Sequence, residues 1–117
     1  MDDWYKMILR FDDKVKEFPV SVDIQLNLYR ILQEQLRNIS KYAHAAIIEV
    51  DVFIIPEYLR MTVLDNGVGF TIDSAKEGIG LTNIKRRAEL VNGKLEIESS
   101  PGNGCKITVD IPLHQIK

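Results

Sequence analysis

The segment Leu59–Gly69, with the sequence LRMTVLDNGVG, decides how the rest of the chain is interpreted. Residues Tyr58–Leu64 are rich in apolar and branched side chains, which predicts a β-strand. The strand pattern ends at Asp65, and Asn66-Gly67 is a strong turn signal. A hairpin would need a second alternating strand directly afterwards, but residues 68–77 do not alternate cleanly, so we expect a flexible loop there.

A second glycine-bearing segment, Gly78-Ile79-Gly80-Leu81, follows this loop and leads into a predicted helix. The helix is expected to run to Val91, because Asn92-Gly93 is a natural C-terminal stop. Backbone amides approach a phosphate closely only where no Cβ intervenes, and a helix N-terminus adds N–H donors and partial positive charge. Gly78 and Gly80 therefore suit a triphosphate, although glycine pairs occur in many turns and each pair alone is a weak signal.

The helix predicted from Ile24 to about Tyr42 carries a polar stripe beside its apolar face. It contains no Pro or Gly, and its apolar residues recur at helical intervals. Glu34, Asn38 and Lys41 are three and four residues apart, so they share one side of the helix. A carboxylate, a carboxamide oxygen and an ammonium in one row suit a nucleotide with its Mg²⁺ ion. The alternative is a solvated face with an ordinary salt bridge, and the helix alone does not separate the two.

The joint order of these motifs is more specific than any one of them. The motifs are Glu34-x-x-x-Asn38-x-x-Lys41, Asp65-x-Gly67-x-Gly69, Gly78-x-Gly80-Leu81, and Gly102-x-Gly104 before a final strand that ends in Pro112-Leu113. From Met7 to Leu113 the chain resembles the ATP-binding domain of sensor histidine kinases, in the superfamily shared with gyrase B, the heat-shock chaperone ATPases and the MutL mismatch-repair proteins. Tyr29–Gln35, Gly80–Arg87 and the short loop Phe70–Glu77 are most similar to the short-lid kinases typified by nitrate and membrane-fluidity sensors.

The resemblance implies a role for each polar motif residue. Asp65 would accept a hydrogen bond from the exocyclic amine of adenine, where guanine presents a carbonyl that a carboxylate repels. Asn38 would coordinate Mg²⁺, and Lys41 and Tyr42 would reach phosphate oxygens. Glu34 is the candidate acid–base or water-orienting residue. The simpler alternatives are a turn-capping Asp65 and a buried helix Asn38.

The resemblance also implies roles for the glycines, and at one position this chain departs from the family's pattern. Gly67 and Gly69 would let the lid fold over the base, while Gly78, Gly80 and the amides near Leu81 would hold the β- and γ-phosphates. Relatives often place Thr where this chain has Cys105. A thiol is a poorer hydrogen-bond partner than the hydroxyl of Thr, so the contact with adenine would be weaker or would be made by a water molecule. The alternative is that Cys105 is simply a small buried residue at the start of a core strand. Tyr42, where many relatives have His, is a mild variation.

The expected fold class is α+β: a two-layer α/β sandwich of the Bergerat type, with a mixed sheet covered on one face by helices. One domain is expected to span residues 1–117. The expected strands are Lys6–Phe11, Ala46–Ile55, Tyr58–Leu64, Lys94–Ser99 and Cys105–Ile111, with a short helical turn near Asp12–Phe18.

Composition excludes several classes of function. A net charge of −2 gives no electrostatic argument for binding nucleic acid or a membrane surface. One Cys excludes an intrachain disulfide and fits a reducing cytosol, and there is no Cys/His cluster of the zinc-binding kind. No apolar run approaches the roughly 20 residues that span a bilayer, and the start Met1-Asp2-Asp3-Trp4 lacks a signal-peptide core. We expect a cytoplasmic location.

The resemblance implies a catalytic domain that uses ATP and Mg²⁺. It would transfer the γ-phosphoryl group to a His on a separate dimerisation hairpin of the same parent kinase, a homodimer, for relay to a response regulator. His44 and His114 are poor candidates for that acceptor, because the first follows the long helix and the second lies in the tail.

Three alternatives from the same superfamily stay open. A serine-kinase anti-sigma factor shares the fold, but the kinase-like first helix and short lid argue against it. A hydrolytic ATPase clamp would need a dimerising arm and a transducer lysine. A non-catalytic regulator would normally have lost Asn38, Asp65 or a lid glycine, and all are present.

Overall fold

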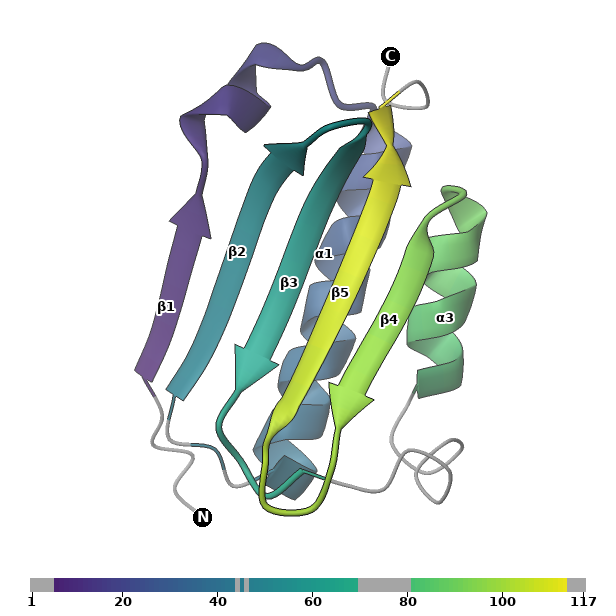
Figure 1. Ribbon diagram of the computed structural model, residues 1–117. Helices are drawn as coiled ribbons and strands as arrows, with labels where there is room; N and C mark the ends of the chain where they lie inside the picture. Colours follow the sequence, from purple (N-terminus) through teal and green to yellow (C-terminus); the bar gives the residue numbers. More distant parts are fainter. Residues whose placement is uncertain (1–5, 44, 46, 70–80, 114–117) are drawn as a thin grey trace.

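A computed structural model describes residues 6–43, 45, 47–69 and 81–113, with Tyr42 and Ala43 through their backbone only. The strands in this part of the chain form one mixed sheet in the order β1-β2-β3-β5-β4 (Figure 1). β1 pairs with β2 in parallel, and the other neighbours are antiparallel. The strands are β1 Lys6–Phe11, β2 Ile47–Ile55, β3 Tyr58–Asp65, β4 Lys94–Ser99 and β5 Cys105–Pro112. All five predicted strands are confirmed to within one residue.

The helices α1 and α3 lie together on one face of the sheet (Figure 1). α1 spans Val22–Asn38, and α3 spans Leu81–Leu90. A 3₁₀ turn, η1, covers Asp13–Glu17, where a short helical turn was expected. The fold is therefore the predicted two-layer α+β sandwich.

Local sequence explains where the helices begin and end. Ser21 caps α1 by accepting a hydrogen bond from the Ile24 N–H at 3.3 Å. α3 ends at Leu90, one residue before the predicted end at Val91. Asn92 adopts a left-handed φ of 56°, and the Gly93 N–H donates to the Ala88 carbonyl at 2.8 Å. The stop predicted at residues 92–93 is confirmed.

Two predicted boundaries were wrong. The first helix was expected to stay α-helical to Tyr42, but α1 ends at Asn38 and continues as a π-helical turn, η2, over Ile39–Ala43. The strand was expected to stop at Asp65, but Asp65 is the last residue of β3 and pairs with Cys105 on β5. The ladder continues through Asp65 because both neighbouring strands reach that level of the sheet.

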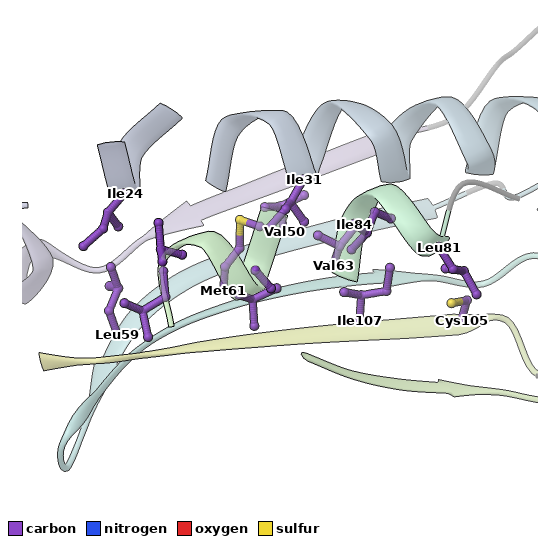
Figure 2. Packing of buried hydrophobic residues seen from close by; sticks show 14 of the residues in the cluster. Ile24, Ile31, Val50, Leu59, Met61, Val63, Leu81, Ile84, Cys105 and Ile107 are labelled. Atoms are coloured by element: carbon purple, nitrogen blue, oxygen red, sulfur yellow. The ribbon is translucent and has the colours of Figure 1, made fainter. Parts of the chain in front are cut away.

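The core lies between the sheet and the two helices (Figure 2). Ile31 of α1 and Ile84 of α3 are fully buried over β3 and β5. Side chains alternate along a strand, so every second residue of β3 and β5 faces the helices. Asp65 lies at the helix-facing phase of β3, two residues after the buried Val63, and Cys105 lies at the helix-facing phase of β5. The end of the core is therefore where polar groups become buried.

Candidate functional site

Asp65 is a buried carboxylate with one oxygen left over. It is 2% exposed, and its Oδ1 accepts a hydrogen bond from the Gly67 N–H at 2.7 Å. Oδ2 is also buried and has no hydrogen-bond partner among the residues that the structure describes. Burial raises the pKa of the Asp65 carboxyl, and the hydrogen bond from Gly67 partly offsets that rise. Buried acceptors in native proteins are almost always paired, so Oδ2 has the capacity to accept a hydrogen bond from a ligand donor.

Backbone contacts around Asp65 require glycine at two positions. Gly69 has φ +69°, and a Cβ there would lie 2.1 Å from the Ser100 carbonyl oxygen. Gly104 has φ +67°, and a Cβ there would lie 2.1 Å from the Asp65 carbonyl oxygen. The loop after β3 and the loop between β4 and β5 are thus in direct backbone contact, with the Gly102 N–H donating to the Val68 carbonyl at 2.6 Å. These two glycine motifs, far apart in the sequence, build one wall of the site.

Asn38 is buried at the end of α1 and contacts a residue that the sequence did not single out. Asn38 is 7% exposed, and its Nδ2 donates to Gln35 Oε1 at 3.3 Å. Gln35 is 3% exposed and its Nε2 donates to Cys105 Sγ at 3.8 Å. Gln35 follows Ile24 and Ile31 on the apolar face, so a carboxamide at a core position was the signal that could have identified it.

Cys105 is buried, which confirms its interpretation as a small residue at the start of a core strand. Burial, with a further contribution from the charge of Asp65, raises the pKa of the thiol to about 12. The thiol therefore stays protonated near neutral pH and acts as a neutral partner for Gln35. A contact between Cys105 and a nucleotide stays a prediction.

Glu34 lies on a different part of the helix layer from Asn38. Its side chain is 21% exposed and pairs with Arg37 at 3.7 Å. It lines a cavity of about 260 Å³ between α1 and α3, together with Arg30, Arg86 and Arg87. Glu34 thus faces a hollow whose other charged lining residues are arginines.

The predicted row of three polar residues is not continuous. Asn38 is buried, whereas Lys41 is exposed on η2. A π-helical turn has wider winding than an α-helix, so Lys41 does not continue the stripe at α-helical spacing. The side chain of Tyr42, together with Gly78 and Gly80, falls outside the described residues.

Leu81 begins α3 and is buried at the same end of the core as Cys105 (Figure 2). The first N–H groups of α3 therefore lie at the level of the sheet where β3 ends, as phosphate contacts would require. Within the described residues there is no group of three or more His, Cys, Asp or Glu side chains that could hold a metal ion. A cation at Asn38 would thus depend on ligand oxygens and water, which suits Mg²⁺ bound to a nucleotide. In the same part of the chain, no helix has the length and apolarity needed to cross a bilayer.

Comparison with known proteins agrees with this geometry. Residues 23–115 match the family described as histidine kinase-, DNA gyrase B-, and HSP90-like ATPase. Sensor histidine kinase LiaS of Bacillus subtilis (strain 168) is 34% identical over 100 residues, which cover 85% of this chain and 28% of LiaS. Sensor protein VraS of Staphylococcus aureus (strain COL) is 31% identical over 111 residues, which cover 94% of this chain and 32% of VraS. The chain spans about a third of the length of these relatives.

Solved structures share the fold. The histidine kinase domain from the Erythrobacter litoralis EL346 blue-light activated histidine kinase superposes with a TM-score of 0.79 at 22% identity, covering 97% of this chain and 54% of that one. Acinetobacter baumannii histidine kinase AdeS gives a TM-score of 0.71 at 13% identity, covering 95% of this chain and 55% of that one. The predicted fold class is confirmed.

A pair of glycine substitutions tests the close backbone contact at Asp65. Gly102 and Gly104 both have positive φ, but a Cβ at Gly102 meets nothing within 4 Å. We expect Gly102→Ala to lower the free energy of unfolding by about 1–2 kcal/mol, the cost of a left-handed conformation. Gly104→Ala should cost about 2 kcal/mol more, because the Asp65 carbonyl must move. Urea denaturation followed by circular dichroism measures both, and equal losses would contradict the contact.

A second prediction concerns the stability of the domain without ligand. Because the pKa of Asp65 is raised in the folded state, ionisation opposes folding above that pKa, and the penalty disappears as the pH falls through it. We expect Asp65→Asn to raise the melting temperature by about 3 °C at about pH 7.5. The gain should shrink as the pH falls through the raised folded pKa toward the ordinary value of 3.8, and it should vanish below that value, where the wild-type carboxyl is protonated in both states.

The control is the substitution Asp13→Asn, because the side chain of Asp13 is 92% exposed. It should change the melting temperature little at either pH. A drop in stability for Asp65→Asn at neutral pH would mean that the unpaired Oδ2 is not a cost to the fold.

Proposed function

Because this chain belongs to the histidine kinase-, DNA gyrase B- and HSP90-like ATPase family, we propose that it is the ATP-binding catalytic domain of a two-component sensor histidine kinase. In the complete kinase it transfers the γ-phosphoryl group of ATP to a His on a separate dimerisation hairpin, and a response regulator then receives the group. The observation that carries the ATP site is the buried, unpartnered Oδ2 of Asp65.

Asp65 can select adenine by hydrogen-bond complementarity. Its Oδ1 is already engaged by Gly67, so Oδ2 is left for one donor. The exocyclic amine of adenine offers that donor, whereas guanine would place a carbonyl oxygen against a buried carboxylate. A site with a buried polar group rejects a ligand that leaves the group unpaired, so the selectivity comes from the cost of the wrong base as well as the gain from the right one.

The phosphate end lies where α1 ends and α3 begins. Asn38 supplies an amide oxygen for Mg²⁺, and the exposed Lys41 supplies a positive charge for phosphate. The N–H groups at the start of α3 add a partial positive charge. Mg²⁺, when bound, neutralises charge on the phosphates during transfer. The nucleotide-contacting set that we propose is Asn38, Lys41, Tyr42, Asp65, Gly67, Gly69, Gly78, Gly80, Leu81 and Cys105.

Glu34 is the proposed catalytic residue. It faces the accessible cavity between α1 and α3, four residues and about one helical turn from Asn38. A carboxylate there can hold and orient the imidazole of the acceptor His or take up its proton. The acceptor is proposed to lie outside this sequence, on the hairpin of the same dimeric parent. We propose a cytoplasmic location for the domain, with no nucleic-acid partner and no membrane contact of its own.

Calorimetric titration with a non-hydrolysable ATP analogue tests the nucleotide site. We expect Mg²⁺-dependent binding, a clear preference over the GTP analogue, and a loss of about 10–100-fold in affinity for Asp65→Asn, since hydrogen bonds to charged groups contribute about 1.5–3 kcal/mol. Asp13→Asn, on the exposed η1 turn, should bind as the wild type does. Equal affinity for the two analogues, or an unaffected Asp65→Asn, would contradict the assignment.

Phosphoryl transfer in trans tests the acceptor class. The domain is mixed with labelled ATP and either the His-bearing hairpin of LiaS or a candidate serine substrate. We expect acid-labile label on the hairpin, and Glu34→Gln should slow transfer about a hundredfold with little change in nucleotide affinity. Acid-stable label on the serine substrate would favour the anti-sigma kinase instead, and binding without transfer would favour a regulator.

A further inference from the structure

Gln35 is a polar residue inside the core, and both ends of its amide are in use. It is 3% exposed and lies on the face of α1 that also carries the buried Ile24 and Ile31. A carboxamide at such a position costs free energy unless its groups are hydrogen-bonded. Oε1 accepts from Asn38, and Nε2 donates to Cys105. In this arrangement the Gln35 amide directs its oxygen to Asn38 and its nitrogen to Cys105.

The same bonds determine which way Asn38 points. The Asn38 amide has one donor group, Nδ2, and one acceptor, Oδ1. With Nδ2 at 3.3 Å from Gln35 Oε1, the acceptor Oδ1 is directed away from Gln35. Rotating the Asn38 amide by half a turn would bring two acceptor oxygens together, which is unfavourable in a buried setting. In the observed arrangement, Oδ1 is therefore the atom of the Asn38 amide that is directed away from Gln35.

Gln35 also connects α1 to the sheet. Its partner Cys105 is 70 residues further along the chain and pairs in register with Asp65 across β3 and β5. If the Gln35 amide alone were reversed, the S–H of Cys105 would donate to Oε1, but Nε2 would face Nδ2 of Asn38 and the hydrogen bond to Asn38 would be lost. A connected set of contacts therefore runs from Asp65, through Cys105 and Gln35, to Asn38.

We propose that Gln35 is a positioning residue that holds the Asn38 amide oxygen toward the Mg²⁺ of the bound nucleotide and ties this end of the site to the strand that carries Cys105. The inference rests on the proposed function, because the cation arrives with the nucleotide. Groups that orient a metal ligand without touching the metal typically contribute 10–100-fold in metal affinity or activity.

The test compares nucleotide affinity with Mg²⁺ and with EDTA in Gln35→Met, which keeps the size of the side chain and removes both hydrogen-bonding groups. The readout is the Mg²⁺ gain, the ratio of the two dissociation constants for a non-hydrolysable ATP analogue. We expect Gln35→Met to reduce this gain about tenfold while changing affinity in EDTA less than about threefold. Gln33→Met is the matched control, because Gln33 is exposed on the same helix. It should leave the gain unchanged.

A double-mutant cycle separates positioning from a general loss of structure. If Gln35 acts through Asn38, the gain in Gln35→Met combined with Asn38→Ala should equal the gain in Asn38→Ala alone. The melting temperature of each variant is measured by circular dichroism, and the titrations are run well below the lowest value, which covers the case in which Gln35→Met is destabilised.

Three results would overturn the proposal. Independent, additive losses in the cycle would mean that Gln35 does not act through Asn38. Equal losses with Mg²⁺ and EDTA would make Gln35 a packing residue of the pocket. If the wild-type domain bound the analogue equally well with Mg²⁺ and with EDTA, Asn38 would have no Mg²⁺ to coordinate and Gln35 would have no ligand to position. Failure of the wild type to bind the analogue at all would instead reject the ATP site itself, and with it this inference.

Discussion

The antiparallel pairing of β3 with β5 is the constraint on which the site depends. It puts Asp65 opposite Cys105 at the end of the sheet, both at the phase that faces the helices. Farther along the same strands that phase is filled by apolar side chains, such as Val63 and Ile107, that form the core. A shift of one residue in the register would turn Asp65 to the open face. The close approach of Gly104 to the Asp65 backbone fixes the turn that makes this register possible.

The candidate site thus lies at the end of the core, where buried polar side chains take the place of apolar ones. Asp65 keeps an unpaired buried oxygen, and burial raises its pKa, so the domain without ligand carries an unfavourable charge. Gln35 and Asn38 are buried too, but they share a hydrogen bond, and Gln35 also donates to Cys105. Among the described residues, Asp65 Oδ2 is thus the fully buried side-chain oxygen that a ligand donor could pair.

Much of this arrangement follows from local sequence patterns. The apolar and branched residues of β3 and the Asn66-Gly67 turn placed the strand correctly to within one residue. The spacing of Glu34, Asn38 and Lys41 predicted one polar stripe, which the structure divides between a cavity, a buried position and an exposed turn. Gln35 was not found, because its partner on β5 is 70 residues away and only the tertiary structure brings the two together. The π-helical turn after Asn38 was also missed, since the apolar periodicity continues to Tyr42 and carries no sign of the change in winding.

That change in winding has a consequence for the phosphate end. An α-helix that continued past Asn38 would keep Lys41 on the same stripe as Asn38, as the spacing alone suggests. The wider turn of η2 instead frees Lys41, which is exposed while Asn38 is 7% exposed. The proposed cation ligand and the proposed phosphate-binding charge therefore occupy different environments. Asn38 is buried and hydrogen-bonded to Gln35, which suits a ligand whose orientation matters, and Lys41 is exposed, which suits an ammonium group that acts as a point charge and needs no fixed direction.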